Sequence, residues 1–227
     1  MNRTKIEWTD YTWNPIKGLC PVNCKTPDGY EYCYARKIYK RFHPDWPPEN
    51  INYPDLLKEP KMPSKPSKIF VCSTFEIFHP YVHEYFRDII FGHIKRNPQH
   101  TFQILTKMPE NIDRPMPDNV WLGTSITGED KEVDWKRISY LESRKSSVKF
   151  ISFEPLLKEI DEEALNSMWF VNWIIIGKLG GYGKKHNPGI EWINGILEYA
   201  EFFDIPPFMK NNLKDIWGED LIQEFPE

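Results

Sequence analysis

Short apolar segments alternate with longer amphipathic segments along the chain after residue 67. This alternation is typical of successive βα units, in which buried strands pair in parallel and helices cover the sheet. Each apolar segment is short and rich in β-branched or aromatic residues, which favours strands. The predicted strands are Tyr11–Pro15, Lys68–Cys72, Thr101–Leu105, Asn119–Gly123, Val148–Ile151, Asn172–Ile176 and Ile205–Met209.

Between these segments, apolar residues recur at the three- and four-residue spacing of an amphipathic helix. The predicted helices are Tyr34–Phe42, Val82–Arg96, Asp130–Glu142, Asp161–Met168 and Ile190–Phe203. We therefore predict an α/β chain folded as a parallel (β/α) barrel, partial in extent, with about six to seven βα units. We expect it to form a single domain over residues 1–227.

The stretch from residue 43 to residue 67 interrupts this pattern. It holds seven prolines and shows little periodicity. A long connection without secondary structure in a compact domain is usually functional or a linker. No second core-forming region precedes this stretch, so we predict a proline-rich loop packed over the barrel and not a domain boundary.

Polar side chains follow the apolar segment of several predicted strands. Because the carboxyl ends of parallel strands meet on one face of a β/α barrel, we expect these side chains to line one site. Ser and Thr have a second interpretation, since both commonly cap the helix that follows. Lys107 and Glu154 need a charged partner in either case, and an ion pair between them is one structural solution. The polar strand-end residues are Ser73, Thr74, Glu76, Thr106, Lys107, Thr124, Ser125, Ser152, Glu154, Lys178 and Lys210.

Composition narrows the classes of function. With 227 residues, 40% of them apolar, the chain can bury one sizeable core. The chain has 29 Lys and Arg residues and 33 Asp and Glu residues, which gives a net charge of -4. This composition gives no indication of nucleic-acid binding. The N-terminal segment lacks the apolar core of a secretion signal, and no apolar stretch reaches the roughly 20 residues that span a bilayer. We therefore expect a cytoplasmic protein without membrane contact.

The cysteines carry the most specific chemistry in the sequence, because thiols in a reducing compartment serve metals or catalysis more often than disulfides. Cys20, Cys24 and Cys33 follow the first predicted strand. Three thiolates suit an iron–sulfur cubane with one iron open to a small molecule. A structural zinc site would need a remote fourth ligand, Cys72 or His43. Buried cysteines without a metal are the third alternative, and we interpret Cys72 as a core residue.

The cysteine segment resembles the radical-SAM signature, named after S-adenosylmethionine (SAM). In that signature three cysteines are separated by three and two residues, and an aromatic residue precedes the third, as Tyr32 precedes Cys33 here. The second gap in this chain has eight residues. The turn-forming run Pro27-Asp28-Gly29 can bulge outward and return the chain to register, so we expect the Lys25–Glu31 insertion to be exposed.

Further segments, in order over nearly the whole chain, resemble a phage-associated family of uncharacterised radical-SAM-like proteins, which is itself similar to spore photoproduct lyase. The matching segments are Trp13–Pro15, Ile69–Val71 with Phe78–His79, Leu105–Lys107, Asn119–Gly123, Ser152–Leu157, Trp173–Gly177 and Pro207–Lys210. The resemblance implies a radical-SAM type of barrel. It also implies an enzyme in which Cys20, Cys24 and Cys33 hold a 4Fe–4S cluster that cleaves SAM reductively to a 5'-deoxyadenosyl radical.

The same resemblance implies roles for the polar strand-end residues. Tyr32 is expected against the adenine of SAM, and Ser73, Thr74 and Glu76 are expected near its amino group. Thr124, Ser125 and Glu154 are expected at the methionine carboxylate or the ribose. Lys107 is expected at the cofactor carboxylate or at the substrate. A reductant protein such as a flavodoxin or ferredoxin is the implied partner.

The sequence leaves the substrate open. Two basic runs, Arg36-Lys37 with Lys40-Arg41 and Lys184-Lys185-His186, allow nucleic acid as a substrate, although such runs are usually solvated faces. Trp8, Trp13 and Trp46 could stack on bases, but we expect at least two of them in the core. The alternative functions are a binding module for nucleic acid or a partner protein, stabilised by zinc or iron–sulfur, and a SAM-binding protein without radical chemistry.

Overall fold

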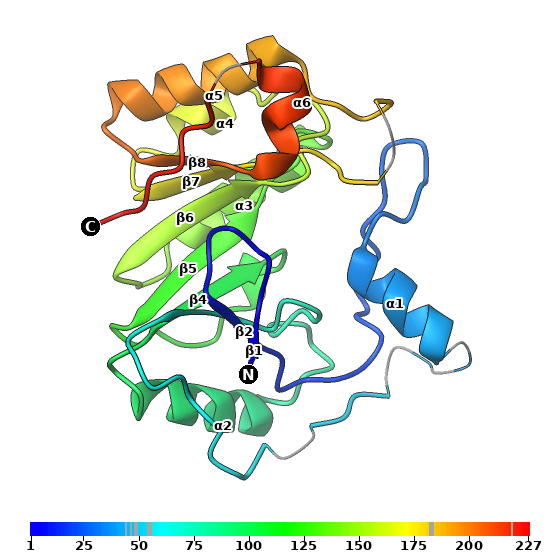
Figure 1. Cartoon of the computed structure of the whole chain (residues 1–227), viewed down its shortest axis with the longest axis vertical. Coiled ribbons are helices and arrows are strands. Elements are labelled where there is room, and N and C mark those ends of the chain that lie inside the picture. Colours follow the sequence, from blue (N-terminus) through cyan, green and yellow to red (C-terminus); the bar gives the residue numbers. More distant parts are fainter. Residues whose placement is uncertain (44, 46, 48–49, 54–55, 182–183, 219) are drawn as a thin grey trace. The chain divides into compact units, whose positions relative to one another are not determined.

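The chain has an α/β fold in which helices alternate with the strands of a mostly parallel sheet (Figure 1). This computed structural model describes residues 1–43, 45, 47, 50–53, 56–181, 184–218 and 220–227. Two compact units, Met1–Trp121 and Leu122–Glu227, divide the chain within strand β5 (Val120–Ser125). The expectation of a single domain over residues 1–227 stays a prediction.

The first unit contains a short sheet in which neighbours in sequence are neighbours in space. Strand β2 pairs in parallel with β3, and β3 pairs in parallel with β4, so that Thr12 lies opposite Phe70 and Phe70 opposite Gln103. Phe102 N–H donates to the carbonyl of Asn119 (2.8 Å), just before β5 begins. The elements of this unit are β1 (Asn2–Arg3), β2 (Tyr11–Trp13), α1 (Tyr34–Phe42), β3 (Lys68–Val71), α2 (Glu84–Lys95), β4 (Thr101–Thr106) and a 3-10 turn η1 (Pro109–Asn111).

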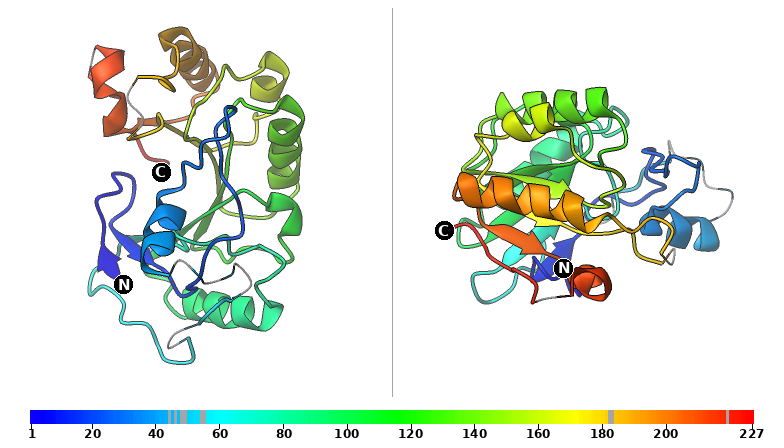
Figure 2. Two further views of the ribbon diagram at one scale, coloured as in Figure 1. Left: turned by 90° about the vertical axis from the view of Figure 1, so that its right-hand side faces the viewer. Right: turned by 90° about the horizontal axis from the view of Figure 1, so that it is seen from above.

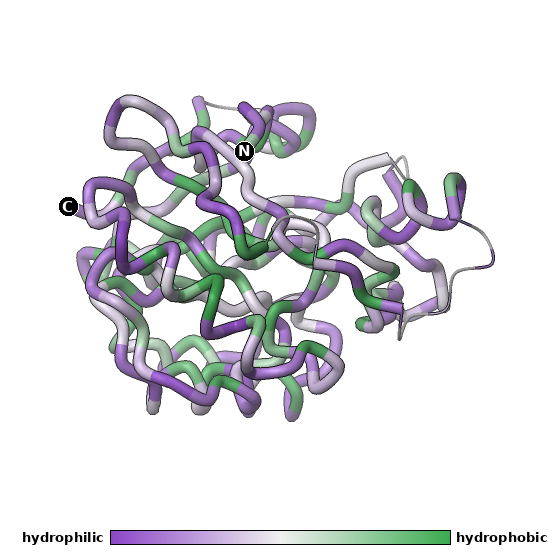
Figure 3. Tube along the Cα trace, turned by 90° about the horizontal axis from the view of Figure 1, so that it is seen from below, coloured by the Kyte–Doolittle hydropathy of each residue, from purple (hydrophilic) through white to green (hydrophobic). Residues whose placement is uncertain are grey.

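The second unit is built around a fully buried strand. All four residues of β7 (Trp173–Ile176) are inaccessible to solvent, because parallel neighbours flank the strand and helices cover it. Helices α3, α4 and α5 flank the strands (Figure 2), and hydrophobic and hydrophilic stretches alternate along the trace of the chain (Figure 3). The other elements are α3 (Lys131–Glu142), β6 (Val148–Phe153), α4 (Glu162–Asn166), α5 (Ile190–Phe202), β8 (Pro207–Met209), a 3-10 turn η2 (Asn211–Leu213) and α6 (Lys214–Trp217).

All seven predicted strands and all five predicted helices are confirmed, with ends that agree within two residues. Differences of two residues occur at the ends of both strands and helices. For example, α2 begins at Glu84 and not at Val82, because the His83 ring accepts a hydrogen bond from the Tyr85 amide (3.2 Å) and so takes the capping position. Among the described helices, none is long and apolar enough to cross a membrane.

Each unit also protects the outer edge of its strands, which the sequence did not predict. In the first unit, β1 pairs antiparallel with β2. In the second unit, a C-terminal segment pairs with β8 through Met209 N–H to the Ile222 carbonyl (2.7 Å) and Glu224 N–H to the Pro207 carbonyl (3.0 Å). Both segments are too short to show periodicity, but they satisfy backbone groups that an edge strand would expose.

The proline-rich loop from residue 43 to residue 67 is described in part, since residues 44, 46, 48–49 and 54–55 lie outside the described residues. Asn52 exchanges two backbone hydrogen bonds with Lys17, each 2.8 Å long. The carbonyl of buried Leu56 lies 2.9 Å from Nε2 of His93 in α2. The described part of the loop therefore packs onto its own unit, and its placement over a barrel stays a prediction.

The expectation that at least two of three tryptophans belong to the core is confirmed. Trp8 is buried against the Phe70 ring, with a distance of 4.7 Å between the ring centroids. Trp13 is buried beside Phe102. Trp46 lies outside the described residues.

Close packing between β5 and β6 in the second unit gives a stability prediction. A Cβ atom at Gly123 would lie 2.5 Å from the Phe150 ring, so Gly123→Ala should lower the free energy of unfolding by about 1–3 kcal/mol. Gly195, inside α5, has no heavy atom within 4 Å of the same position, and Gly195→Ala should stabilise by about 0.5–1 kcal/mol. Urea unfolding measures both values, and a neutral Gly123→Ala would contradict this packing.

Candidate functional site

The Lys25–Glu31 insertion folds into a small closed loop. Its first and last residues form an antiparallel bridge, and at its base the Tyr32 amide donates a hydrogen bond to the carbonyl of Cys24 (3.1 Å). Lys25 and residues 27–30 are exposed, as the sequence predicted, but Thr26 is buried and Glu31 is half-buried. The insertion therefore forms a loop that projects from the site and returns to it. As a result, the Cys33 side chain lies near Cys24.

The Cys24 and Cys33 side chains lie close enough to change each other's protonation. The interaction with Cys24 lowers the pKa of Cys33 to about 6, and the interaction with Cys33 raises the pKa of Cys24. The amides of Arg36 and Ala35, in the first turn of α1, lower the pKa of Cys33 further, although its sulfur does not meet the geometry of a capping hydrogen bond. The pair therefore favours one thiolate.

Cys20 completes the group of thiols. Burial raises the pKa of Cys20 to about 11, and the amides of Val22 and Glu76, which point to its sulfur, oppose this effect. The charges of Cys20, Cys24 and Cys33 act on one another, so the three thiols share one electrostatic environment. Over the residues that the structure describes, no set of three or more His, Cys, Asp or Glu is arranged as a preformed metal site.

Arg36 fastens helix α1 to the cysteine loop. Its Nε donates to Glu31 Oε1 (2.9 Å), and its NH1 donates to the carbonyl of Cys20. Lys40, one turn further along α1, donates to both oxygens of Glu31 (2.9 Å each). The interpretation of this basic run as a solvated face is wrong for Arg36, which is buried. A signal was present in the sequence, since Arg36 follows Cys33 by one helical turn and therefore points back toward the loop.

Glu76 is buried and its carboxylate is already hydrogen bonded. Oε1 accepts from Thr106 Oγ1 (2.6 Å) and from the Phe78 amide (3.2 Å), and Oε2 accepts from the Lys107 amide (2.8 Å). Burial raises the pKa of Glu76. Glu76 thus ties the segment after β3 to the end of β4. The positive charge of Lys107 opposes the rise in the pKa of Cys24 and contributes to the lowered pKa of Cys33, so this predicted residue lies near the thiols.

The remaining predicted residues of the first unit lie around the end of β3. Ser73 Oγ donates to Asn14 Oδ1 (3.1 Å), and its carbonyl accepts from the hydroxyl of Tyr34 (3.3 Å). Thr74 and Tyr32 are half-buried. Cys72 is buried, as expected for a core residue, and its φ of +58° is unusual for a side chain other than glycine.

In the second unit, Glu154 forms an ion pair with Lys210, which follows β8. Gly177 makes room for this pair, because a Cβ atom there would lie 3.0 Å from the Lys210 side chain and 3.3 Å from Glu154. Ser152 lies in β6, two residues before Glu154. It is buried, and its hydroxyl has no hydrogen-bond partner among the described residues. The sequence placed Lys210 at a strand end without assigning it to the site.

Thr124 and Ser125 are both buried at the end of β5. Successive side chains of a strand point to opposite faces, so we expect only one of the two to contact a given ligand. The carbonyl of Ser125 accepts a hydrogen bond from Arg137 of α3 (3.2 Å). This contact links the end of β5 to the helix that follows it.

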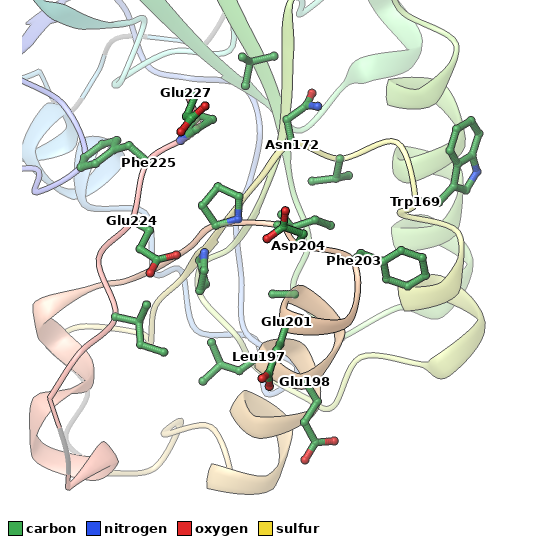
Figure 4. Close-up of a pocket in the computed structure, with 18 of the residues that line it drawn as sticks. Trp169, Asn172, Leu197, Glu198, Glu201, Phe203, Asp204, Glu224, Phe225 and Glu227 are labelled. Atoms are coloured by element: carbon green, nitrogen blue, oxygen red, sulfur yellow. The ribbon is translucent and has the colours of Figure 1, made fainter.

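A cavity of about 1150 Å³ opens at the other end of the second-unit strands, where β6, β7 and β8 begin (Figure 4). Its described lining includes the carboxylates of Glu198, Glu201, Asp204 and Glu224, and no predicted site residue. The predicted site residues of this unit lie at the opposite, carboxyl ends of the strands. This acidic cavity is therefore not the predicted site.

Comparison with protein families adds one finding. The family model described as "Protein of unknown function (DUF5131)" matches residues 3–222. The chain belongs to the DUF5131 family. Neither a curated protein nor a solved structure matches it. In this DUF5131 protein the matched range contains the three clustered cysteines and the Glu154–Lys210 pair.

The interaction between Cys24 and Cys33 predicts the reactivity of metal-free protein. Because the pKa of Cys33 is lowered to about 6, the thiolate of Cys33 should form as pH rises through that value, and alkylation by iodoacetamide should rise with it. Cys24→Ala removes the neighbouring thiol and should shift this midpoint to higher pH. Peptide mapping by mass spectrometry gives both midpoints, and a midpoint that Cys24→Ala leaves unchanged would contradict the interaction.

Proposed function

We propose that this protein is a radical-SAM enzyme in which Cys20, Cys24 and Cys33 hold a 4Fe–4S cluster. The observation that carries the proposal is that three thiols from one loop lie close enough to change one another's protonation. We further propose that the parallel strands form a partial β/α barrel of the radical-SAM type. The resemblance of the cysteine segment and of the further matching segments supports the same assignment.

The donor set fits such a cluster better than it fits a structural zinc ion. Three sulfur ligands leave one iron of a cubane open, whereas tetrahedral zinc needs a fourth protein ligand. Backbone amides point to the sulfurs of Cys20 and Cys33, and the charge of Lys107 acts on Cys24 and Cys33. Amides and a nearby cation stabilise thiolates and tune a bound cluster.

When bound, such a cluster supplies one electron to the sulfonium of SAM, and the carbon–sulfur bond breaks to give methionine and a 5'-deoxyadenosyl radical. The residues of this chain bind and orient the cofactor. We assign the adenine contact to Tyr32, and contacts to the amino group to Ser73 and Thr74. Glu76 already accepts three hydrogen bonds, so we propose that it mainly positions the backbone amide that points to Cys20.

We assign contacts with the methionine carboxylate or the ribose to one of Thr124 and Ser125. For Glu154 we propose a contact with the ribose hydroxyls, because its carboxylate would repel that of methionine. The buried hydroxyl of Ser152, which lacks a partner among the described residues, supports a polar ligand near Glu154, because buried hydroxyls are usually hydrogen bonded. Lys210 holds the Glu154 carboxylate in place. Lys107 is assigned to the cluster environment or to the substrate.

The cluster assignment is tested by replacing one cysteine at a time. Protein purified without oxygen should contain about four iron atoms per chain and should form 5'-deoxyadenosine from SAM with dithionite as reductant. Cys33→Ala should lose both the iron and the product. Cys72→Ala is the matched control, because it removes a thiol outside the cluster and should keep both. Stoichiometric zinc, or a Cys33→Ala protein that still cleaves SAM, would refute the proposal.

The SAM site is tested separately from the cluster. Glu154→Ala should weaken SAM binding about tenfold or more while the iron content stays unchanged, because the carboxylate contacts SAM and not the metal. Asp215→Ala is the control, since it breaks a different ion pair of the second unit, between Lys178 after β7 and Asp215 in α6. Equilibrium dialysis with labelled SAM measures the affinities. Equal affinity of Glu154→Ala and the unaltered protein would remove Glu154 from the site.

A further inference from the structure

Helix α1 carries an apolar stripe on its exposed side. Tyr34, Ile38 and Phe42 follow one another at four-residue intervals, which places them on one side of the helix. Their exposed fractions are 54%, 54% and 68%. We call these three residues the α1 stripe.

The α1 stripe faces away from the core. In most helices the apolar side faces the core. On α1 the buried residue is Arg36, which binds Glu31 and the carbonyl of Cys20. Helix α1 also stands apart from the strands of its own unit (Figure 1). Because contiguous exposed apolar residues mark interaction sites on soluble proteins, the stripe has the character of a docking surface.

The charged residues beside the α1 stripe indicate what kind of partner would bind there. Helix α1 contains no acidic residue, and Lys37 and Arg41 are exposed next to the stripe. The whole chain carries a net charge of -4, so α1 is a local basic surface on an acidic protein. A partner with an apolar patch surrounded by Asp and Glu would complement both properties.

The position of the stripe connects it with the cysteine site. Tyr34 directly follows Cys33, and its hydroxyl donates to the carbonyl of Ser73 at the end of β3 (3.3 Å). A protein that covers the stripe therefore comes to rest beside the proposed cluster. We propose that the α1 stripe is the docking surface for a small acidic protein that carries single electrons.

This inference rests on the proposed function, which consumes one electron for each SAM cleaved. The reduced carrier loses one electron in each encounter, and the cluster gains that electron. No proton or chemical group passes between the two proteins. The exposed Lys37 and Arg41 hold the acidic carrier, and Ile38 and Phe42 exclude water from the contact.

A nucleic acid fits the stripe less well than a protein does. Single-stranded nucleic acid needs aromatic rings for successive bases along a continuous basic groove. The centre of the α1 stripe is the aliphatic Ile38, and the ammonium group of Lys40 is bound to Glu31. An apolar centre with charges at its margin is typical of a protein interface.

Binding is measured first, because this measurement needs no SAM cleavage. Anaerobically purified protein is titrated by calorimetry with a purified acidic flavodoxin and with an acidic ferredoxin. We expect binding to at least one of them, weakening with added salt. Ile38→Asp should reduce this affinity about tenfold or more, because it places a charge at the centre of the contact. Trp135→Asp on α3 is the control, since Trp135 is exposed to a similar extent (52%).

Product formation gives the second measurement. Ile38→Asp should lower 5'-deoxyadenosine formation about tenfold with the carrier protein as reductant and leave the rate with dithionite unchanged, because dithionite needs no docking surface. No binding to either carrier, equal binding by Ile38→Asp, or an equal loss with dithionite would overturn the inference. Binding of a single-stranded oligonucleotide that Ile38→Asp abolishes would also overturn it.

Failure of the proposed function has a different signature. In that case the unaltered protein would form no 5'-deoxyadenosine even with dithionite. The calorimetric titration would still decide whether the stripe binds an acidic carrier. The two hypotheses can therefore fail independently.

Discussion

The hydrogen bond from the Tyr32 amide to the Cys24 carbonyl is the constraint on which the cysteine site depends. It closes the loop that separates Cys24 from Cys33, and Gly29 permits the closure because its φ of +86° suits a residue without a Cβ atom. Cys33 then adopts an extended backbone and α1 begins at the next residue. The Cys33 sulfur consequently meets both a neighbouring thiol and the amides of a helical turn.

Near the cysteines, the buried charged side chains of Arg36 and Glu76 both have hydrogen-bond partners. The buried guanidinium of Arg36 meets a carboxylate and a carbonyl, and the buried carboxylate of Glu76 meets a hydroxyl and two amides. Burying either charge alone would cost several kcal/mol, on the order of what a small domain has in total stability. These contacts give the loop a defined shape, so that the sulfurs are held near one another by the protein itself.

The same contacts explain why α1 exposes its apolar side. Arg36 must point toward the loop, since its guanidinium bridges Glu31 and the Cys20 carbonyl. Residues at positions 34, 38 and 42 lie on another side of the helix and cannot also face the loop. The orientation of a surface apolar stripe thus follows from a buried charge. In the second unit, Gly177 leaves the space in which Glu154 and Lys210 meet, because it has no side chain.

The sequence by itself determined the order, type and approximate ends of the main elements, because β-branched runs such as Trp173–Ile176 and the helical period of Ile190–Phe202 are local signals. It also identified the three clustered cysteines. Only the tertiary structure decided which side chains pair. Glu154 binds Lys210, 56 residues away, and Glu76 binds Thr106, 30 residues away. Such contacts depend on where the strand ends meet in space, which no local pattern encodes. The burial of Arg36 and the pairing of the C-terminal segment with β8 were decided in the same way.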